Sequence, residues 1–387
     1  MFRRPSAPVV NGCRSRLTYP DTVRILLWSA LYWPNIGGEE RYVQRLARGL
    51  QRLDCRVEVV TNSIEREVAS EVVDGVIVSR LPIPASTHGD MDAIRAVRAG
   101  FGEIVKRLQP QLVNVHTSGP SLGHYERLRR AVPAPLVVTF HGVYPHAADQ
   151  RGRISGALER GAGSIASSAA TKASLINLDS IRGRNVTVAL PAVDDDASPL
   201  HPYPEGPPVL VGLGRMVPEK GWDTLLHAFV RLLEICPTCR LVLIGDGTHL
   251  ESLQRLANDL GVFAFVRFTG LVSDDQARTL LDESSVVIVP SIHDEGFGMV
   301  AIEASMRARP VVASNSGGLN EAVINNVTGL LVPAGDPIAL AAAILSIVDD
   351  RAMAIRLGAS GRTYAETLSV DALATKTMTV FRQALLV

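Results

Sequence analysis

The sequence has no long hydrophobic run, no excess of charge of either sign and few cysteines. Even the apolar run at residues 284–292 is short and is followed by His293, whereas a membrane-spanning helix needs about 20 apolar residues. The 39 Lys and Arg residues balance the 39 Asp and Glu residues, so composition does not favour nucleic-acid binding, which requires the neutralisation of many phosphates. We therefore expect neither a transmembrane segment nor a nucleic-acid partner.

Residues 1–22 begin with charges but lack the apolar stretch of about 7–15 residues that follows in a signal peptide. We therefore expect a disordered N-terminal arm and a cytoplasmic protein. The arm carries Arg3, Arg4, Arg14 and Arg16, so a weak contact with the inner face of a membrane is an open alternative to a solvated tail.

Four cysteines in 387 residues do not make a disulfide framework, and we expect reduced thiols. Cys236 and Cys239 have the spacing of a redox pair, but they lie between a helix-like run and a strand-like run, with a proline between them and no second pair.

Short β-rich runs alternate with amphipathic helical runs, and this alternation predicts an α/β protein with parallel sheets. The strand-like runs of the first half are residues 23–29, 57–62, 112–116, 135–141, 164–168 and 186–190, and those of the second half are residues 209–214, 240–247, 266–271, 286–291 and 310–315. A proline-rich segment at residues 200–208 interrupts the pattern and indicates a linker. We predict domains at 23–204 and 205–369, and a helix at 370–387 that could pack back across them.

In each predicted domain, one glycine-containing loop follows the first strand. Gly37 and Gly38 precede a helix, so their backbone could approach an anion, although a plain turn explains them equally well. In the second domain, Arg215 and Lys220 lie in the loop between Gly214 and Gly221 and could clamp a diphosphate. The alternative for Lys220, one of only four lysines, is an exposed pair with Glu219 or Asp223. Neither loop has the dinucleotide or P-loop spacing.

The segment from Pro290 to Ala304 carries two glutamates at the end of a strand. Glu295 lies in a glycine-flanked loop, and Glu303 is the only charge in the helix that follows. A lone carboxylate in an apolar run needs hydrogen-bond partners, and sugar hydroxyls would serve. The alternative partner is Arg307, four residues later.

His116 and His141 end two strands of the first domain and are expected to face the same ligand site as the Gly37–Gly38 loop. A competing motif, G-x-S-x-G at residues 119–123, would make Ser121 a hydrolase nucleophile, but Ser121 reads equally well as a helix N-cap. No zinc-type ligand spacing is present.

Together these motifs, in this order, resemble the family 4 retaining glycosyltransferases of the GT-B fold. The matching segments are Gly37–Arg41, Gly214–Gly221, Gly245–Gly247 and the E-x7-E segment from Glu295 to Glu303. The resemblance implies two Rossmann-like domains that face one another across a deep cleft. The second domain would hold the nucleotide-sugar donor mainly, and the first would hold the acceptor.

The resemblance also implies roles for individual residues. Arg215 and Lys220 would bind the donor diphosphate, and Glu303 the ribose hydroxyls. Gly38 and Gly37 would approach the diphosphate, and His141 would contact the sugar near the reacting carbon. The donor hexose, phosphate and base would be held by Glu295, Gly296, Phe297, Gly298, Leu271 and Val272. Candidates for the acceptor side are Trp28, Tyr32, Trp33, His116 and Tyr144.

The expected reaction is the transfer of a hexose by same-face substitution, with His141, Glu295, Arg215 and Lys220 at the reacting centre and no essential metal or cofactor. The donor is expected to be a UDP or GDP sugar, and the acceptor a carbohydrate, a lipid-linked or a small natural-product hydroxyl. Alternatives are an epimerase or phosphorylase of similar shape, or a catalytically silent sugar-binding subunit. The chain departs from the family pattern at Ala308, where glycine is common, and at Pro191–Asp194. The scarcity of lysine beside abundant arginine, alanine and glycine suggests a GC-rich bacterial genome.

Overall fold

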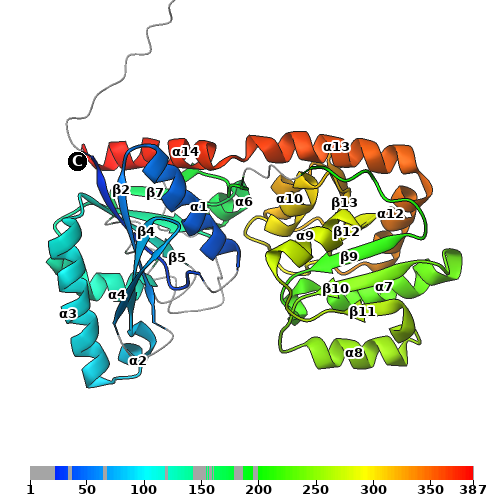
Figure 1. Ribbon diagram of the computed structural model, residues 1–387, viewed down its shortest axis with the longest axis horizontal. Helices are drawn as coiled ribbons and strands as arrows, with labels where there is room; N and C mark the ends of the chain where they lie inside the picture. The colour runs from blue at the N-terminus through cyan, green and yellow to red at the C-terminus, as the bar shows by residue number, and fades with distance from the viewer. Residues whose placement is uncertain are drawn as a thin grey trace, which may run out of the picture.

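The protein is described by a computed structural model in which two lobes lie side by side (Figure 1). The described residues are 22–33, 37–63, 68–117, 121–142, 161–177, 186–194 and 199–386, together with Ile154, Gly156 and Glu159. Residues 1–21 of the predicted arm and Tyr144 lie outside them. Below, the first lobe comprises the described residues up to Asp194 together with the C-terminal helix, and the second lobe comprises residues 199–369.

The first lobe is built on one sheet of eight described strands in the order β3-β4-β2-β1-β5-β6-β7-β8. All neighbours pair in parallel except β3 with β4. The strands are β1 (Arg24–Trp28), β2 (Arg56–Asn62), β3 (Ala69–Val73), β4 (Val76–Leu81), β5 (Leu112–Thr117), β6 (Leu136–Phe140), β7 (Gly163–Ala166) and β8 (Val186–Val188). Their apolar runs fit strands that are covered on both faces.

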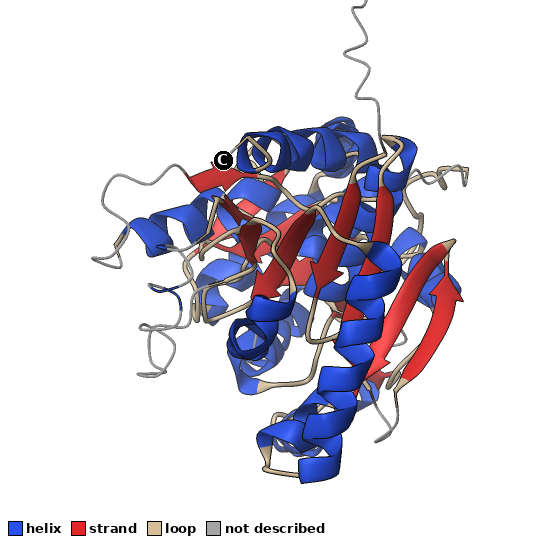
Figure 2. Ribbon diagram, turned by 90° about the vertical axis from the view of Figure 1, so that its left-hand side faces the viewer, coloured by secondary structure: helices blue, strands red, loops and turns tan. Residues whose placement is uncertain are grey.

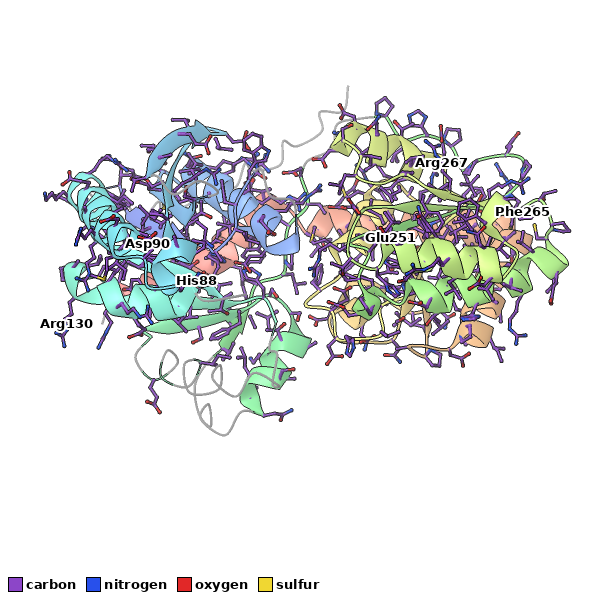
Figure 3. The ribbon with its side chains drawn as sticks, turned by 90° about the horizontal axis from the view of Figure 1, so that it is seen from below. His88, Asp90, Arg130, Glu251, Phe265 and Arg267 are labelled. Atoms are coloured by element: carbon purple, nitrogen blue, oxygen red, sulfur yellow. The ribbon has the colours of Figure 1, made fainter. Side chains whose placement is uncertain are left out.

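Helices cover both faces of this sheet (Figure 2). They are α1 (Gly38–Arg52), α2 (Ile83–Thr87), α3 (Met91–Leu108), α4 (Ser121–Leu128), the short η1 (Arg129–Ala131) and α6 (Ala169–Ile176). The helix α3 begins where Asp90, labelled in Figure 3, accepts hydrogen bonds from the backbone N–H groups of Asp92 and Ala93, both at 3.0 Å.

The second lobe holds a six-stranded parallel sheet in the order β11-β10-β9-β12-β13-β14. Its strands are β9 (Val209–Leu213), β10 (Arg240–Ile244), β11 (Val266–Phe268), β12 (Val286–Val289), β13 (Val311–Ser314) and β14 (Gly329–Val332). Its helices are η3 (Pro218–Lys220), α7 (Trp222–Ile235), α8 (Leu250–Asp259), η4 (Phe263–Phe265), α9 (Asp274–Asp282), α10 (Met299–Met306), α11 (Leu319–Ala322), α12 (Pro337–Asp349) and α13 (Arg351–Thr367). Two largely parallel sheets with crossover helices confirm the predicted α/β class with two sheets.

The chain crosses between the lobes twice. The C-terminal helix α14 (Val370–Ala384) follows α13 along the top of both lobes and packs on α1 and β7 of the first lobe (Figure 1). The linker is tied to the second lobe, because Arg307 donates a hydrogen bond to the carbonyl of Pro199 and Arg309 donates to the carbonyls of His201 and Pro202. The linker therefore packs with the second lobe several residues before position 205.

Ala308 occupies a backbone conformation that favours glycine. It follows α10 with a φ of 54°. The N–H groups of Ala308 and Arg309 donate to the carbonyls of Ser305 and Ala304, which is the hydrogen-bond pattern of a helix end that usually carries glycine. The departure from the family pattern therefore costs conformational energy.

We predict that Ala308→Gly raises the free energy of unfolding by about 1 kcal/mol, because a side chain at positive φ is strained by about that amount. Ala308→Val is the matched comparison and should destabilise, since a branched β-carbon increases the strain. Urea unfolding of the three proteins measures both effects. A glycine variant no more stable than the wild type would contradict this account.

Candidate active site

The two sheets place their ligand-binding edges toward one another. In the first sheet β1 lies between β2 and β5, and in the second β9 lies between β10 and β12, so each strand order reverses at one point. Ligands of open α/β sheets bind at the carboxyl ends of the strands where this reversal occurs. The segments that follow β1, β9 and β12 start at these points and lead to Gly38, Lys220 and Glu295, respectively.

Lys220 and Glu295 form an ion pair between the loops after β9 and β12. The hydroxyl of Ser291 donates to the same carboxylate oxygen of Glu295 at 2.6 Å. The expected alternative partners of Lys220 do not take this place: Asp223 instead accepts from His249 at 2.8 Å if the ring nitrogen carries the proton. Both predicted residues thus lie in one partly buried cluster.

A glycine fixes the distance between these two loops. Gly221 has a φ of 69°, and a β-carbon there would lie 2.1 Å from the carbonyl oxygen of Pro290. The N–H of Ile292 donates to the carbonyl of Glu219 at 3.0 Å. The close backbone approach holds Lys220 beside Glu295.

The N-termini of α1 and α10 approach one another across the lobes. A β-carbon on Gly38 would lie 4.0 Å from Cγ of Met299, the first residue of α10. The residues that precede these helices, Gly37 and Gly298, have no capping side chain. Both helices therefore direct their positive dipole ends toward the same region, where an anion is stabilised.

Glu303 is engaged by the opposite lobe. Arg41 of α1 donates to Glu303 at 2.7 Å and to Asp274 at 2.8 Å. The expected alternative partner, Arg307, instead binds both carboxylate oxygens of Asp282 at 2.7 Å. Glu303 keeps 19% of its side chain exposed, so a ligand hydroxyl could compete with Arg41.

Arg215 is exposed and acts electrostatically on the first lobe. Burial raises the pKa of Glu40 in α1, while the charge of Arg215 opposes that rise. Arg215 and Lys220 therefore supply positive charge on the side of the second lobe that faces α1. This fits the predicted clamp for a diphosphate.

His116 and His141 lie side by side at the ends of β5 and β6. The Nδ1 of His116 is 2.9 Å from the Nε2 of His141, and the rings are stacked at 18°. Burial, and then His141, hold the pKa of His116 well below its usual value, and burial lowers the pKa of His141 to about 3. The pair is therefore neutral at physiological pH.

The neutral pair predicts a loss of stability in acid. Each histidine takes up a proton below about pH 6.5 in the unfolded chain but not in the folded one, so stability is complete above that pH and falls as the pH drops. Lowering the pH from 7.5 to 5.5 should therefore lower the free energy of unfolding by about 3 kcal/mol through this pair. The urea midpoint should fall between these two pH values, and replacing His116 by asparagine should remove about half of that fall. An unchanged pH dependence in this variant would contradict a neutral pair.

Glycines bring the loop after β12 against the first lobe. A β-carbon on Gly296 would lie 2.2 Å from the carbonyl oxygen of His141. The N–H of Gly318 donates to the carbonyl of Glu295 at 2.8 Å, and a β-carbon on Gly318 would lie 2.3 Å from the carbonyl oxygen of Gly296. A side chain at Gly296 would separate the predicted donor loop from His141, and one at Gly318 would displace the same loop within the second lobe.

The remaining predicted residues have varied environments. Phe297 is buried in the core of the second lobe, Val272 is partly buried and Leu271 is 81% exposed. Trp33 is 49% exposed, whereas Trp28 and Tyr32 are fully buried, so the expectation that these two line the acceptor side is wrong. His116 is fully buried as well, so the same expectation is wrong for it. Trp28 is the last residue of β1, and its ring packs on Phe101 and Tyr125.

Two competing interpretations gain no support. Ser121 is the first residue of α4, and no described residue accepts a hydrogen bond from its buried hydroxyl as an activating base would. Cys236 and Cys239 are free thiols, and burial raises the pKa of Cys239 to about 12, which makes its thiol unreactive.

Several residues of the site were not predicted from the sequence. Arg41, Ser291 and Gly318 contact predicted residues, and Glu321 of the second lobe accepts hydrogen bonds from the N–H groups of Ala169 and Ala170 at 2.7 and 3.0 Å. The only signal for Arg41 was its position directly after the Gly37–Glu40 turn. The other contacts depend on segments that are distant in the sequence.

Within the described part of the chain, no helix is long and apolar enough to cross a membrane. The same residues contain no group of three His, Cys, Asp or Glu side chains arranged to hold a metal ion. A surface cavity lined by residues that include Arg24, Gln111 and Tyr125 lies at the amino ends of β1 and β5, opposite the candidate site.

Two family models match the chain in succession. The model described as Glycosyltransferase Family 4 matches residues 36–197, and the model described as Glycosyl transferases group 1 matches residues 194–364. A glycogen synthase of Mycobacterium tuberculosis (strain ATCC 25618 / H37Rv) is 30% identical over 379 residues, which cover 88% of this chain and 89% of the relative. A D-inositol 3-phosphate glycosyltransferase of Frankia alni is 32% identical over 347 residues, covering 78% of this chain and 83% of the relative.

Other relatives match over part of their length or by fold. A GDP-mannose-dependent alpha-(1-6)-phosphatidylinositol monomannoside mannosyltransferase of M. tuberculosis is 38% identical over 163 residues, 41% of this chain, and the match spans 42% of that relative. The structure of a sucrose-phosphate synthase from Thermosynechococcus elongatus has a TM-score of 0.77 and 25% identity, covering 93% of this chain and 98% of the other. Anabaena HepE in complex with UDP and glucose has a TM-score of 0.74, 20% identity, and coverage of 93% and 99%, respectively, which shows the shared fold.

Proposed function

The chain belongs to the family 4 (group 1) glycosyltransferases of the GT-B fold, and from this premise we propose that it transfers a hexose from a nucleoside-diphosphate sugar to an acceptor hydroxyl with retention of configuration. The observation that carries the proposal is the convergence of Lys220, Glu295 and the N-termini of α1 and α10 at the facing edges of the two sheets. This arrangement offers a basic side chain and two positive helix dipole ends to a diphosphate.

The donor is bound mainly by the second lobe. Arg215 and Lys220 hold the diphosphate, Glu303 accepts hydrogen bonds from the ribose hydroxyls after leaving Arg41, and Glu295 and the backbone of Gly296–Gly298 hold the hexose and phosphate. Leu271 and Val272 contact the base. The exposed position of Leu271 suits a residue that becomes covered when a ligand binds.

Bond cleavage is assisted by charge stabilisation. As the bond between the anomeric carbon and the phosphate oxygen breaks, the diphosphate gains negative charge, which Arg215, Lys220 and the helix N-termini stabilise. The acceptor oxygen attacks the same face and passes its proton to the departing phosphate oxygen. His141 contacts the sugar as a neutral ring, and no protein nucleophile is needed.

We propose that the reaction needs no metal, because the two basic side chains and the helix N-termini perform the charge neutralisation that a divalent ion would perform. Turnover should persist in EDTA. Loss of activity in EDTA, with recovery on addition of Mg²⁺ or Mn²⁺, would contradict this part of the proposal.

The named activities of the relatives guide the choice of substrates. GDP-mannose and UDP-glucose should be tested as donors, with inositol phosphates and oligosaccharides as acceptors. NMR of the product's anomeric proton reports whether the configuration is retained. Donor incubated without acceptor tests the alternatives, since an epimerase or a hydrolase would change the donor alone and a silent subunit would change neither compound.

A further inference from the structure

We propose that His116 is a positioning residue that holds the ring of His141 and fixes its proton on Nδ1, so that His141 presents an N–H donor to its ligand. The inference rests on the proposed function in one respect, because only that function places His141 at the donor sugar. The arrangement of the two rings is independent of it.

The backbone of two neighbouring strands places the rings of His116 and His141 beside one another. His116 is opposite Thr139 in the parallel register of β5 and β6, and His141 follows β6 directly. Tyr42 packs edge-on against both rings, with ring centroids 5.8 Å from His116 and 4.7 Å from His141. The hydroxyl of Tyr42 donates to the carbonyl of Ala189 at 3.2 Å, so Tyr42 is itself held in place. The rings therefore have little freedom to rotate.

Only one proton can lie between the Nδ1 of His116 and the Nε2 of His141, which are 2.9 Å apart. If His141 donated it, His116 would carry its own proton on Nε2. That atom is fully buried and has no hydrogen-bond partner among the described residues. An unpaired buried N–H is rare in folded proteins. If His116 donates instead, Nε2 keeps only a lone pair, and no N–H is left unpaired there.

The second arrangement determines what His141 offers. Its Nε2 accepts from His116, so its proton is on Nδ1. His141 is only half-buried, and within the described part of the chain its Nδ1 has no partner. This N–H is therefore the group that a hydroxyl or phosphate oxygen of the ligand can reach.

The test combines tautomer detection with kinetics on three variants of the full chain. Nitrogen-15 NMR of the histidine rings, assigned with the variants, should show His141 protonated on Nδ1 in the wild type. His116→Leu should give His141 a mixture of tautomers and lower kcat/KM about 10- to 100-fold, as loss of an orienting partner does elsewhere. His116→Asn should recover most of this loss, because its amide N–H lies at the same number of bonds from the backbone as Nδ1 of histidine.

Thr139→Val is the matched control, since it removes a buried hydrogen bond between the same two strands, from Asn114 to Thr139 at 2.9 Å, without touching His141. It should leave the tautomer and kcat/KM unchanged. A wild-type His141 protonated on Nε2, or an asparagine variant no better than leucine, would overturn the proposal. If the wild type transfers no sugar, the proposed function fails, and the NMR measurement alone then decides the role of His116.

Discussion

Replacing Lys220 by alanine is expected to lower kcat/KM by about 10²- to 10³-fold, the range found when a preorganised donor to a developing negative charge is removed. Lys220 lies in the loop after β9 and pairs with Glu295, and it reaches the region where the N-termini of α1 and α10 converge. The loss should fall mainly on kcat, because the diphosphate gains charge as the bond breaks. Steady-state kinetics with saturating acceptor measures the effect.

Lys376→Ala provides the control for this experiment. Lys376 is one of the three other lysines and is exposed on α14. The control should keep wild-type kinetics, and both variants should keep the wild-type circular dichroism spectrum. A folded Lys220→Ala variant with kcat/KM within about threefold of the wild type would show that Lys220 does not stabilise the leaving group.

Replacing Gly296 by alanine is expected to lower kcat/KM by about 10²-fold or more. The new β-carbon would lie 2.2 Å from the carbonyl oxygen of His141, so the donor loop and the first lobe must separate by about 1 Å. Misplacing reacting groups by this distance costs about 10²-fold. The effect is steric, because Gly296 is not among the glycines with positive φ.

The control is Gly102→Ala in α3, where a β-carbon would meet nothing within 4 Å. That variant should keep its activity and gain up to about 1 kcal/mol of stability from the higher helix propensity of alanine. Small-angle scattering of Gly296→Ala should report a more open pair of lobes. Wild-type kinetics in this variant would show that the contact between Gly296 and His141 is not part of the active arrangement.

The sequence predicted the strands that carry the site because buried parallel strands have a strong apolar pattern and end in glycine-rich loops. It missed β3 and β4, although Asp74–Gly75, with φ values of 51° and 77°, is a typical hairpin turn. The expectation of uninterrupted strand–helix alternation hid this signal. Trp28 was expected on the acceptor side, but it ends β1 and its ring packs on Phe101 and Tyr125.

Contacts between segments distant in the sequence could not be predicted. Side chains four residues apart on a helix can pair, which predicted Arg307 as the partner of Glu303. The helix α10 ends at Met306, however, so Arg307 lies outside it and binds Asp282 instead. The partner of Glu303, Arg41, is 262 residues away and belongs to the other lobe. The approach of Gly296 to His141 likewise depends on how the lobes meet.

The central claim is that the facing edges of the two sheets bind a nucleoside diphosphate. Calorimetric titration of the wild type, Lys220→Ala and Glu303→Ala with UDP, GDP, ADP and dTDP tests it most directly. We predict that one diphosphate binds the wild type and that each variant weakens binding about 10-fold or more, since each removes charged hydrogen bonds of about 1.5–3 kcal/mol. Failure of all four nucleotides to bind the wild type, or equal binding by both variants, would contradict the claim.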